Sequence, residues 1–402
     1  MMSDRTLCHP IQAEQAAVVE TRRDNASPIE RFVHALIGDA LRVGASDIHI
    51  EPGETGYQIR RRVDGVLQLT TLPPEDIAAR LPTKIKVMAN LDIAERRLPQ
   101  DGRLHIPAQD HAAIDLRVST LPTLWGEKIV LRLLGGGHQP QIESLGMDPD
   151  QQRLFLRTLA QPQGMILVTG PTGSGKTATL YGGLRHLNND RLNITTAEDP
   201  VELYLPGVNQ VAIRPRIGLD FARTLRAMLR QDPDIIMVGE IRDLETANMA
   251  VRAAHTGHLV LSTLHTSSAL GTVERLIQMG IPAHSLASSI SLIVAQRLLR
   301  RLCEHCKEPI ASSSSCPQSG GQTYRAPVGG CSQCFDGYAG RLGIFELLEV
   351  SNVQFAPTHP SPPPALRDLY HHAERLVAAG ITSREEVLRV LPTPALPQDS
   401  PG

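Results

Sequence analysis

One stretch constrains this chain more than any other: an apolar run that opens into a glycine-rich loop. Met165 to Val168 read Met-Ile-Leu-Val, and Thr169 to Thr177 read Thr-Gly-Pro-Thr-Gly-Ser-Gly-Lys-Thr. The order predicts a buried strand, a loop and a helix, with the G-x-x-x-x-G-K-S/T spacing of a phosphate-binding loop. Glycines let backbone N–H groups converge on a phosphate without Cβ clashes, and the helix start adds the positive end of its dipole. The sequence therefore predicts a nucleoside triphosphate site rather than an ordinary glycine-rich turn.

The residues of this loop have distinct expected roles. Lys176 would hold the β and γ phosphates of ATP, and the Thr177 hydroxyl would hold Mg²⁺. The predicted nucleotide-binding residues are Gly170, Pro171, Thr172, Gly173, Ser174, Gly175, Lys176 and Thr177.

The composition disfavours several classes of protein. The chain has 402 residues, enough for two or three domains, and its net charge of -2 gives no basic footprint for nucleic acid or membranes. One tryptophan and 3% aromatic residues disfavour stacking platforms for single strands. The sequence has no apolar run of about 18 residues and no charged leader with an apolar core. We expect a cytoplasmic protein, a setting in which the six cysteines of the chain favour metal binding over disulfide bonds.

The first part of the chain predicts a small α+β domain over residues 28–134, after a polar tail at 1–27. Ser27, Pro28 and Glu30 have the pattern of a helix start, and Gly44 that of its end. The other expected elements are strands at 46–51, 57–63, 114–118 and 128–134 and a helix over 77–91.

A glycine run at Gly135 to Gly137 marks a hinge within a linker at 135–150. Beyond it, apolar strands alternate with helices to about residue 300, which predicts a parallel sheet with helices on both faces. The expected segments are an ATPase core at 151–302, a cysteine module and return segment at 303–351, a proline-rich linker at 352–364, helices at 365–391 and a disordered tail at 392–402.

Two predicted strands of this core end in carboxylates. One leads to Glu198, and the other, Asp234 to Glu240, has four apolar residues before its acid, as a Walker B segment does. Parallel strands deliver their C-terminal residues to the ligand crevice, so both glutamates are candidates for activating water or supporting Mg²⁺. The alternative is that each is an ordinary surface carboxylate at a strand end.

A third such strand, at 259–266, carries His265 near its end and has His258 just before it. A lone histidine is more often a satisfied core residue. The position of His265 beside the ligand crevice makes a phosphate-sensing role an equal alternative.

Two C-x-x-C pairs follow the core, with 24 residues between Cys306 and Cys331. Four thiolates can close a tetrahedral Zn²⁺ site, and redox cysteines are the competing interpretation. The predicted ligands are Cys303, Cys306, Cys331 and Cys334, with His305 as a substitute, while Cys8 and Cys316 are expected to be free.

Eight short motifs occur in order along the chain: Gly44–Glu51, Arg97–Arg103, Asp115–Thr120, Gly170–Thr177, Glu198–Glu202, Arg230–Asp234, Gly239–Asp243 and Ser262–Thr266. Together they resemble the secretion ATPases of type II secretion and type IV pilus assembly, over about residues 28–351. The resemblance implies a RecA-like P-loop ATPase core, a preceding PAS-like domain, a tetracysteine zinc module and a homo-hexamer. It also implies a place on the cytoplasmic side of the inner membrane, with an inner-membrane platform protein as partner.

Carried over residue by residue, the resemblance places Glu198 in the family's acidic box and Glu240 in Walker B. It places His258 and His265 in the histidine box, with Lys176 in the Walker A loop. These are roles that the family implies for matching positions.

Two regions depart from the family. The long N-terminal domain that docks on a membrane-anchored adaptor is nearly absent, and the helical region after Leu348 is shortened and interrupted by prolines. Whether such an adaptor is a partner of this chain is therefore an open question. The tetracysteine module favours an assembly ATPase over the pilus-retraction branch.

The core sequence lacks an obvious arginine finger, but Arg117 and Arg132 lie on strands of the first domain. Their neighbours at 116, 118, 131 and 133 are aliphatic, so both arginines should point to the opposite face. The resemblance supports a finger that reaches nucleotide between domains, as the hinge moves. The alternative is that each pairs with a carboxylate on a solvated sheet face.

The sequence thus predicts ATP hydrolysis that drives pseudopilus assembly for type II secretion. Alternatives are a type IV pilus assembly or DNA-uptake motor, a DNA-translocating RecA-like motor, and a nucleotide-gated structural subunit with little turnover. No nucleic-acid partner is expected.

Overall fold

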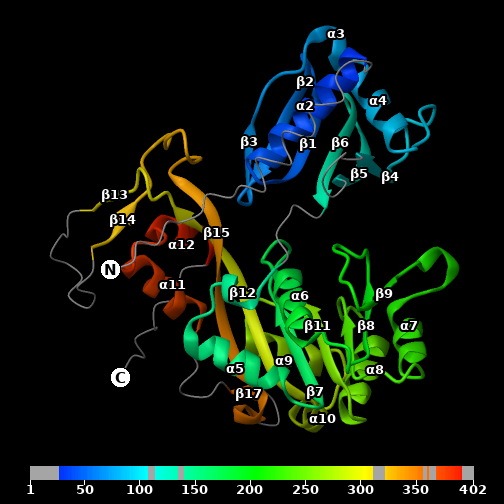
Figure 1. Ribbon diagram of the computed structural model, residues 1–402, viewed down its shortest axis with the longest axis vertical. Coiled ribbons are helices and arrows are strands. Elements are labelled where there is room, and N and C mark those ends of the chain that lie inside the picture. The colour runs from blue at the N-terminus through cyan, green and yellow to red at the C-terminus, as the bar shows by residue number, and fades with distance from the viewer. Residues whose placement is uncertain are drawn as a thin grey trace, which may run out of the picture. The chain divides into compact units, whose positions relative to one another are not determined.

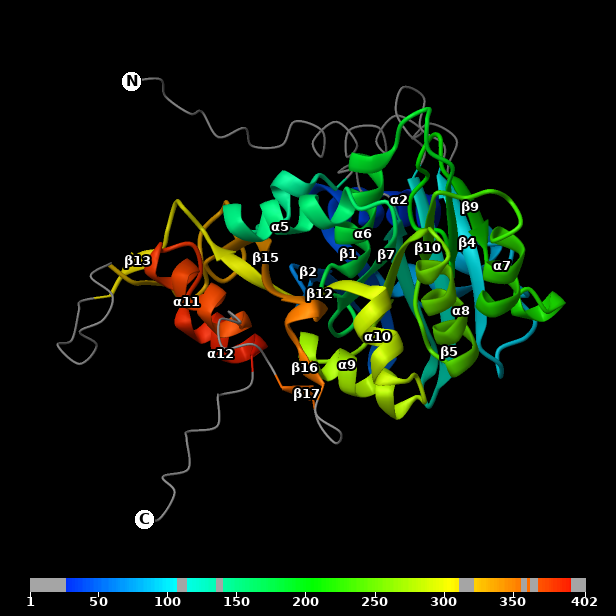
Figure 2. The same ribbon diagram turned by 90° about the horizontal axis from the view of Figure 1, so that it is seen from below.

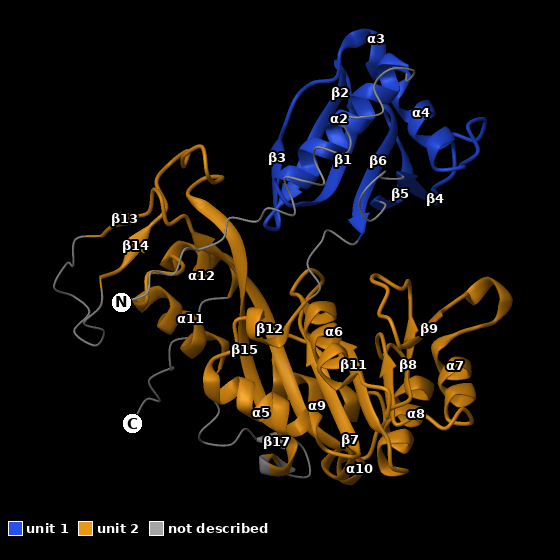
Figure 3. Cartoon of the chain, viewed as in Figure 1, with its two compact units in different colours: residues 1–138 blue, residues 139–402 orange. Residues whose placement is uncertain are grey.

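The computed structural model describes residues 27–106, 114–134, 140–310, 322–355, 360–361 and 368–391. The chain forms two compact units, residues 1–138 and 139–402, which Figure 3 shows in blue and orange. The predicted tails, the Gly135–Gly137 hinge, most of the proline-rich linker, Cys8 and Cys316 lie outside the described residues.

Unit 1 contains one six-stranded antiparallel sheet in the order β3-β2-β1-β6-β5-β4. Ile48, Ile50, Leu116 and Ile129 on one face of the sheet pack with Val33 and Ile37 of α2, so the helices cover this face. The elements, labelled in Figure 1, are α2 (Pro28–Arg42), β1 (Ala45–Gly53), β2 (Gly56–Val63), β3 (Val66–Leu69), α3 (Glu75–Ala78), α4 (Leu81–Met88), β4 (Gln100–Ile106), β5 (Ile114–Thr123) and β6 (Gly126–Leu134).

The start of α2 is confirmed: the Ser27 side chain accepts a hydrogen bond from the Glu30 N–H, and Pro28 opens the helix. The Glu30 carboxylate binds Lys84 of α4, 2.8 Å away. The prediction of one helix over 77–91 is wrong, because the chain forms α3 and α4 instead. Pro82 lies in the first turn of α4, where its missing N–H does no harm, and it could not continue a helix begun at Glu75. Strand β4 was not predicted.

Unit 2 is built on a seven-stranded sheet in the order β15-β12-β7-β11-β10-β8-β9. The six strands from β12 to β9 are parallel, which confirms the predicted parallel sheet, and β15 adds an antiparallel edge. Core clusters cover both faces of the sheet. The strands are β7 (Gly164–Thr169), β8 (Ile194–Glu198), β9 (Asn209–Ala212), β10 (Ile235–Val238), β11 (Leu259–Leu264), β12 (Ile290–Leu302) and β15 (Tyr338–Glu349).

The remaining elements of unit 2 complete its two faces. Helices α11 and α12 lie beside β15 and β12 in both views (Figures 1 and 2). The helices are α5 (Pro149–Leu159), α6 (Lys176–Leu187), α7 (Phe221–Met228), α8 (Leu244–His255), α9 (Ala269–Gln278), α10 (Ala283–Ser289), α11 (Leu369–Ala378) and α12 (Arg384–Val390). Short pieces are η1 (Ile142–Ser144), η2 (Pro215–Ile217), η3 (Val350–Asn352), β13 (Glu308–Pro309), β14 (Tyr324–Arg325), β16 (Gln354–Phe355) and β17 (Pro360–Ser361).

Candidate active site

The predicted strand, loop and helix around the glycines are confirmed as β7, residues 170–175 and α6. Every residue of β7 is buried, as expected for a central parallel strand. Gly170, Gly173 and Gly175 have φ values of 150°, 81° and 89°, which residues other than glycine rarely adopt. The loop backbone therefore depends on these glycines.

Close neighbours also restrict the loop. A Cβ on Gly170 would lie 2.5 Å from the Gln296 carbonyl oxygen, and a Cβ on Gly175 would lie 2.8 Å from the Gln296 side-chain nitrogen. Ser174 Oγ is buried and has no hydrogen-bond partner among the described residues. A tight glycine cradle at a helix start, with an unsatisfied hydroxyl inside it, fits a bound phosphate.

Lys176 is the first residue of α6, and its side chain folds back over the loop. Its Nζ donates to the Gly170 carbonyl at 2.8 Å and to the Pro171 carbonyl at 3.2 Å. The side chain is 9% exposed, and burial lowers the pKa of its ammonium group. The ammonium group therefore lies at the phosphate loop. The two carbonyl oxygens that hold it could be replaced by phosphate oxygens.

Glu240 and His265 meet at the carboxyl ends of β10 and β11. Glu240 Oε2 lies 3.1 Å from His265 Nε2, and Glu240 Oε1 lies 2.5 Å from Arg242 Nη2. Burial alone would raise the pKa of Glu240, but Arg242 and His265 together hold it below its usual range. Glu240 is therefore an ionised, partly buried carboxylate at the ligand edge of the sheet.

His265 also reaches the phosphate loop, because its Nδ1 lies 3.4 Å from Lys176 Nζ. An ammonium group only donates and a carboxylate only accepts, so Nδ1 faces a donor and Nε2 faces an acceptor. His265 thus connects Lys176 with Glu240 in one group.

Glu198 is at the end of β8 and is 4% exposed. Its carboxylate accepts hydrogen bonds from Tyr181 Oη and Thr196 Oγ1, each at 2.5 Å, and from Gln210 Nε2 at 3.1 Å. Unlike Glu240, this carboxylate is surrounded by uncharged donors.

The structure does not bring His258 into this group. The residue precedes the amino end of β11, and its Nδ1 lies 2.9 Å from the Ala253 carbonyl oxygen. His265 follows the other end of the same strand, roughly 20 Å away along six extended residues. The two histidines therefore lie at opposite ends of β11.

Arg117 and Arg132 belong to unit 1, where they lie opposite each other on β5 and β6. Arg132 Nε lies 2.8 Å from Asp47 Oδ1, and Arg117 Nη2 lies 3.4 Å from Asp101 Oδ1. The Arg132 side chain is 57% exposed and the Arg117 side chain is 45% exposed, whereas the neighbouring Leu116 and Leu131 are buried. Both arginines thus lie on the solvated face of the sheet, opposite the aliphatic face, as predicted. Each is paired with an aspartate.

The four predicted cysteine ligands converge, with all Sγ atoms within 4.8 Å of one another. Their shorter separations are 3.8 Å for Cys303–Cys331 and 3.6 Å for both Cys306–Cys334 and Cys331–Cys334. These distances are far beyond a disulfide bond and near the roughly 3.8 Å sulfur separation that tetrahedral Zn–S bonds give. The substitute ligand His305 is exposed and is not in the group.

Three residues that shape the site were not predicted from the sequence: Tyr181, Arg242 and Arg297. Arg297 Nη2 donates to the Ser267 carbonyl at 2.8 Å, beside Gly170. Tyr181 could have been noticed, since it lies one helical turn after Thr177 on α6. Arg242 follows Glu240 by two residues, but its partner becomes clear only from the fold.

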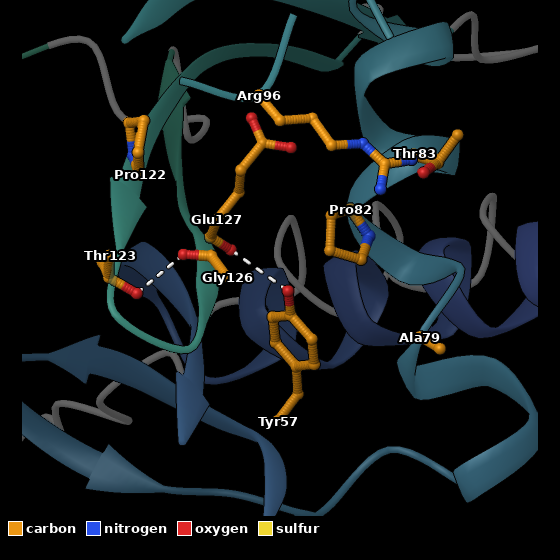
Figure 4. Close-up of a pocket in the computed structure, with 9 residues that line it drawn as sticks. All are labelled: Tyr57, Ala79, Pro82, Thr83, Arg96, Pro122, Thr123, Gly126 and Glu127. Carbon is orange, nitrogen blue, oxygen red and sulfur yellow. Dashed lines mark hydrogen bonds between the residues drawn. The ribbon is translucent and has the colours of Figure 1, made fainter. Parts of the chain in front are cut away.

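Unit 1 contains a separate cavity of about 160 Å³. Figure 4 shows Tyr57, Arg96 and Glu127 among its lining side chains, with the Tyr57 hydroxyl donating to the Glu127 carbonyl at 3.4 Å. None of the predicted site residues lines it.

Among the described helices, none combines the length and apolar content of a membrane span.

Comparison with known proteins places the chain in a family. Residues 22–389 match the family model described as Type II/IV secretion system protein. The chain is 49% identical over 385 residues to the "Type IV pilus assembly ATPase PilB" of Pseudomonas aeruginosa, covering 90% of this chain and 68% of that protein. It is 45% identical over 386 residues to the "Type II secretion system ATPase E" of Vibrio cholerae, covering 91% and 76%. It also matches the PilB protein of Acinetobacter baylyi at 51% identity, spanning 58% of that relative's length.

Two solved structures are similar in fold. The pilus retraction motor PilT with bound ADP is 26% identical, has a TM-score of 0.58, and is matched over 92% of this chain and 98% of that one. The Legionella pneumophila ATPase DotB is 21% identical, has a TM-score of 0.65, and is matched over 89% and 94%. With its mixed α/β fold and its phosphate loop, the chain belongs to the Type II/IV secretion system protein family, as a secretion or pilus-assembly ATPase.

Proposed function

We propose that this chain is the ATP-driven motor of pseudopilus assembly in a type II secretion system. The observation that carries the proposal is the meeting of Lys176, His265 and Glu240 at the carboxyl ends of three parallel strands. Ligands bind at this edge of open α/β sheets, and the three side chains have the chemistry that phosphoryl transfer needs.

The phosphate loop binds ATP through its backbone N–H groups, and Lys176 exchanges the loop carbonyls for β and γ phosphate oxygens. Mg²⁺ held through the Thr177 hydroxyl would neutralise charge that develops on those oxygens. Glu240 orients or deprotonates the attacking water, since it is ionised and partly buried. His265 connects the lysine to Glu240, so it can respond to the presence of the γ phosphate.

The finer domain assignments belong to the same proposal. Unit 2 is a RecA-like ATPase core, which its mostly parallel sheet supports. Unit 1 is a PAS-like domain, which its six-stranded antiparallel sheet with helices on one face supports. The four cysteines hold a structural Zn²⁺ ion, and their mutual sulfur distances support that role.

The motor works as a homo-hexamer on the cytoplasmic side of the inner membrane and acts on a platform protein there. Arg117 and Arg132 supply positive charge to a neighbouring nucleotide site after leaving their aspartate partners. A type IV pilus is the second candidate system, because the similarity to PilB is slightly greater than that to the type II ATPase. A membrane-anchored adaptor is an additional partner that the experiment below also examines.

The test has two parts. The purified protein should release phosphate from ATP, and Lys176→Ala should reduce the rate at least about 100-fold, because the charge on the phosphates is then unbalanced. Lys84→Ala, which removes a partly buried ammonium group paired with Glu30 in unit 1, is the matched control. A Lys176→Ala protein with the wild-type rate would contradict the assignment of the site.

The second part identifies the system. In a strain that lacks its own copy of the gene, the wild-type gene should restore protein secretion and the Lys176→Ala gene should not. Restoration of surface pili or of DNA uptake, with secretion unchanged, would assign the motor to those systems instead. Crosslinking to the platform protein and to an adaptor in the restored strain would show which partners it contacts.

A further inference from the structure

Tyr181 makes a buried contact that neither the nucleotide motif nor the acidic motif contains. Its side chain is fully buried, and its hydroxyl donates to Glu198 Oε2 at 2.5 Å. Burial, followed by the nearby Glu198 carboxylate, raises the pKa of the Tyr181 hydroxyl. The hydroxyl therefore keeps its proton at every working pH and remains a donor to the carboxylate.

The position of Tyr181 on α6 relates it to the nucleotide site. It follows Thr177 by four residues, so the two side chains project from the same face of the helix, one turn apart. Thr177 begins this face at the phosphate loop, and Tyr181 continues it to the end of β8. A displacement of the helix start would thus move the hydroxyl that holds Glu198.

The same hydroxyl also contacts the segment that follows β8. The Leu203 N–H donates to Tyr181 Oη at 3.4 Å. Gln210 repeats this connection from β9, because its Nε2 donates to Glu198 Oε1 at 3.1 Å and to the Leu203 carbonyl at 2.9 Å. Glu198 and Tyr181 together therefore fix the backbone of residues 199–203.

That segment carries two acidic residues whose charges reach the site. Burial lowers the pKa of Lys176, while the charges of Glu240 and Glu202 raise it. Asp199 interacts electrostatically with Arg242, the partner of Glu240. The position of the 199–203 segment therefore affects the charge around Lys176 and around Arg242, the partner of Glu240.

We propose that Tyr181 is a positioning residue for ATP hydrolysis, which couples the phosphate-loop helix to the acidic 199–203 segment through the Glu198 carboxylate. Glu198 acts as the anchor of that segment, and Glu240 is the carboxylate that meets the attacking water. This inference rests on the proposed ATPase site.

Tyr181→Phe tests the coupling, because it removes only the hydroxyl and keeps the ring in its core cluster. We expect kcat for ATP to fall about tenfold or more, since a buried carboxylate loses a donor, while KM changes less than about twofold. Tyr370→Phe is the matched control: Tyr370 Oη is also buried but has no hydrogen-bond partner among the described residues, so kcat should not change.

A double-mutant cycle separates positioning from simple packing. If Tyr181 acts through Glu198, then Tyr181→Phe should lower kcat less than about twofold further in a Glu198→Gln background. Effects that multiply in the double variant, or an unchanged kcat in Tyr181→Phe alone, would overturn the proposal. Thermal melting of each variant shows whether it folds.

Thr196→Val is the second variant if Tyr181→Phe does not fold. It removes the Thr196 hydroxyl, which donates to Glu198 Oε1 at 2.5 Å, and it keeps the side-chain shape. The same fall in kcat and the same lack of additivity with Glu198→Gln are expected, and multiplied effects would again contradict the inference. Wild-type and Lys176→Ala rates, measured alongside, show separately whether the ATPase assignment itself holds.

Discussion

Glu240 Oε2 lies 3.1 Å from His265 Nε2, although the two residues are 25 positions apart and follow different strands. Because β10 and β11 are parallel neighbours, their carboxyl ends lie at the same edge of the sheet. His265 in turn lies beside Lys176 of the phosphate loop. The three side chains therefore connect the predicted Walker A and Walker B segments.

Glu240→Gln should keep ATP bound while it slows hydrolysis at least about 100-fold. The amide preserves the shape of the side chain and can still accept a hydrogen bond from His265, but it cannot take a proton from water or balance Arg242. Equilibrium binding of a fluorescent ATP analogue and steady-state phosphate release measure the two effects. Glu54→Gln, on an exposed turn of unit 1, is the matched control. Loss of ATP binding would instead give Glu240 a purely metal-holding role.

The cysteine cluster should contain about one Zn²⁺ ion per chain. Cys303→Ser should lose the metal and lower the melting temperature of the surrounding module, because the remaining thiolates cannot close a tetrahedral site. Cys316→Ser changes a cysteine outside the described residues and should keep the metal. Elemental analysis of freshly purified, reduced protein checks the content, and a disulfide without metal would contradict the assignment.

Arg117→Ala and Arg132→Ala should each lower ATP turnover, since an arginine at the γ phosphate contributes about 10³ to 10⁵ in rate. If the arginines act on a neighbouring protomer, mixing either variant with inactive Lys176→Ala chains should restore some hydrolysis. Each chain then supplies the part that the other lacks. Arg31→Ala, another arginine of unit 1, should retain wild-type turnover.

Two outcomes of that experiment count against the finger. Mixed assemblies that contain both chains but recover no activity would exclude action between protomers. Wild-type turnover by the arginine variants alone would exclude the finger and leave the pairs with Asp47 and Asp101 as a sufficient account.

Unfolding should become easier below about pH 6.5 because of His372 on α11. The ring is 4% exposed, its Nδ1 accepts a hydrogen bond from the Phe345 N–H at 3.1 Å, and burial lowers its pKa from 6.5. The unfolded chain then binds a proton more readily than the folded chain, so stability falls as pH decreases through 6.5. Above that value this contribution is constant.

Urea unfolding at several pH values measures the effect, which is at most about 1.4 kcal/mol per pH unit. His372→Gln should reduce the slope below pH 6.5, whereas His371→Gln, at the exposed neighbouring position, should retain it. An equal slope in the wild type and the His372→Gln variant would mean that other groups cause the acid sensitivity.

The phosphate loop and the convergence of the four cysteines could be predicted from the sequence, because each is marked by short local motifs. The strand before Gly170 and the helix from Lys176 follow from local periodicity, and the parallel sheet follows from the repeated alternation. The break at Pro82 was equally local and could have been predicted. Strand β4 was less apparent, because charged and polar residues occupy most of it.

The tertiary structure decided which of the predicted side chains meet. His258 and His265 lie on either side of β11, so the strand separates them, and only His265 reaches Lys176, 89 positions away. Glu198 and Glu240 have the same position at the ends of their strands in the sequence. In the structure, Glu198 is surrounded by the uncharged donors Tyr181, Thr196 and Gln210. Glu240 instead contacts Arg242 and His265. Such differences arise from contacts between segments that are distant in the sequence. The order of the strands in the sheet brings these segments together, and that order is a property of the tertiary structure.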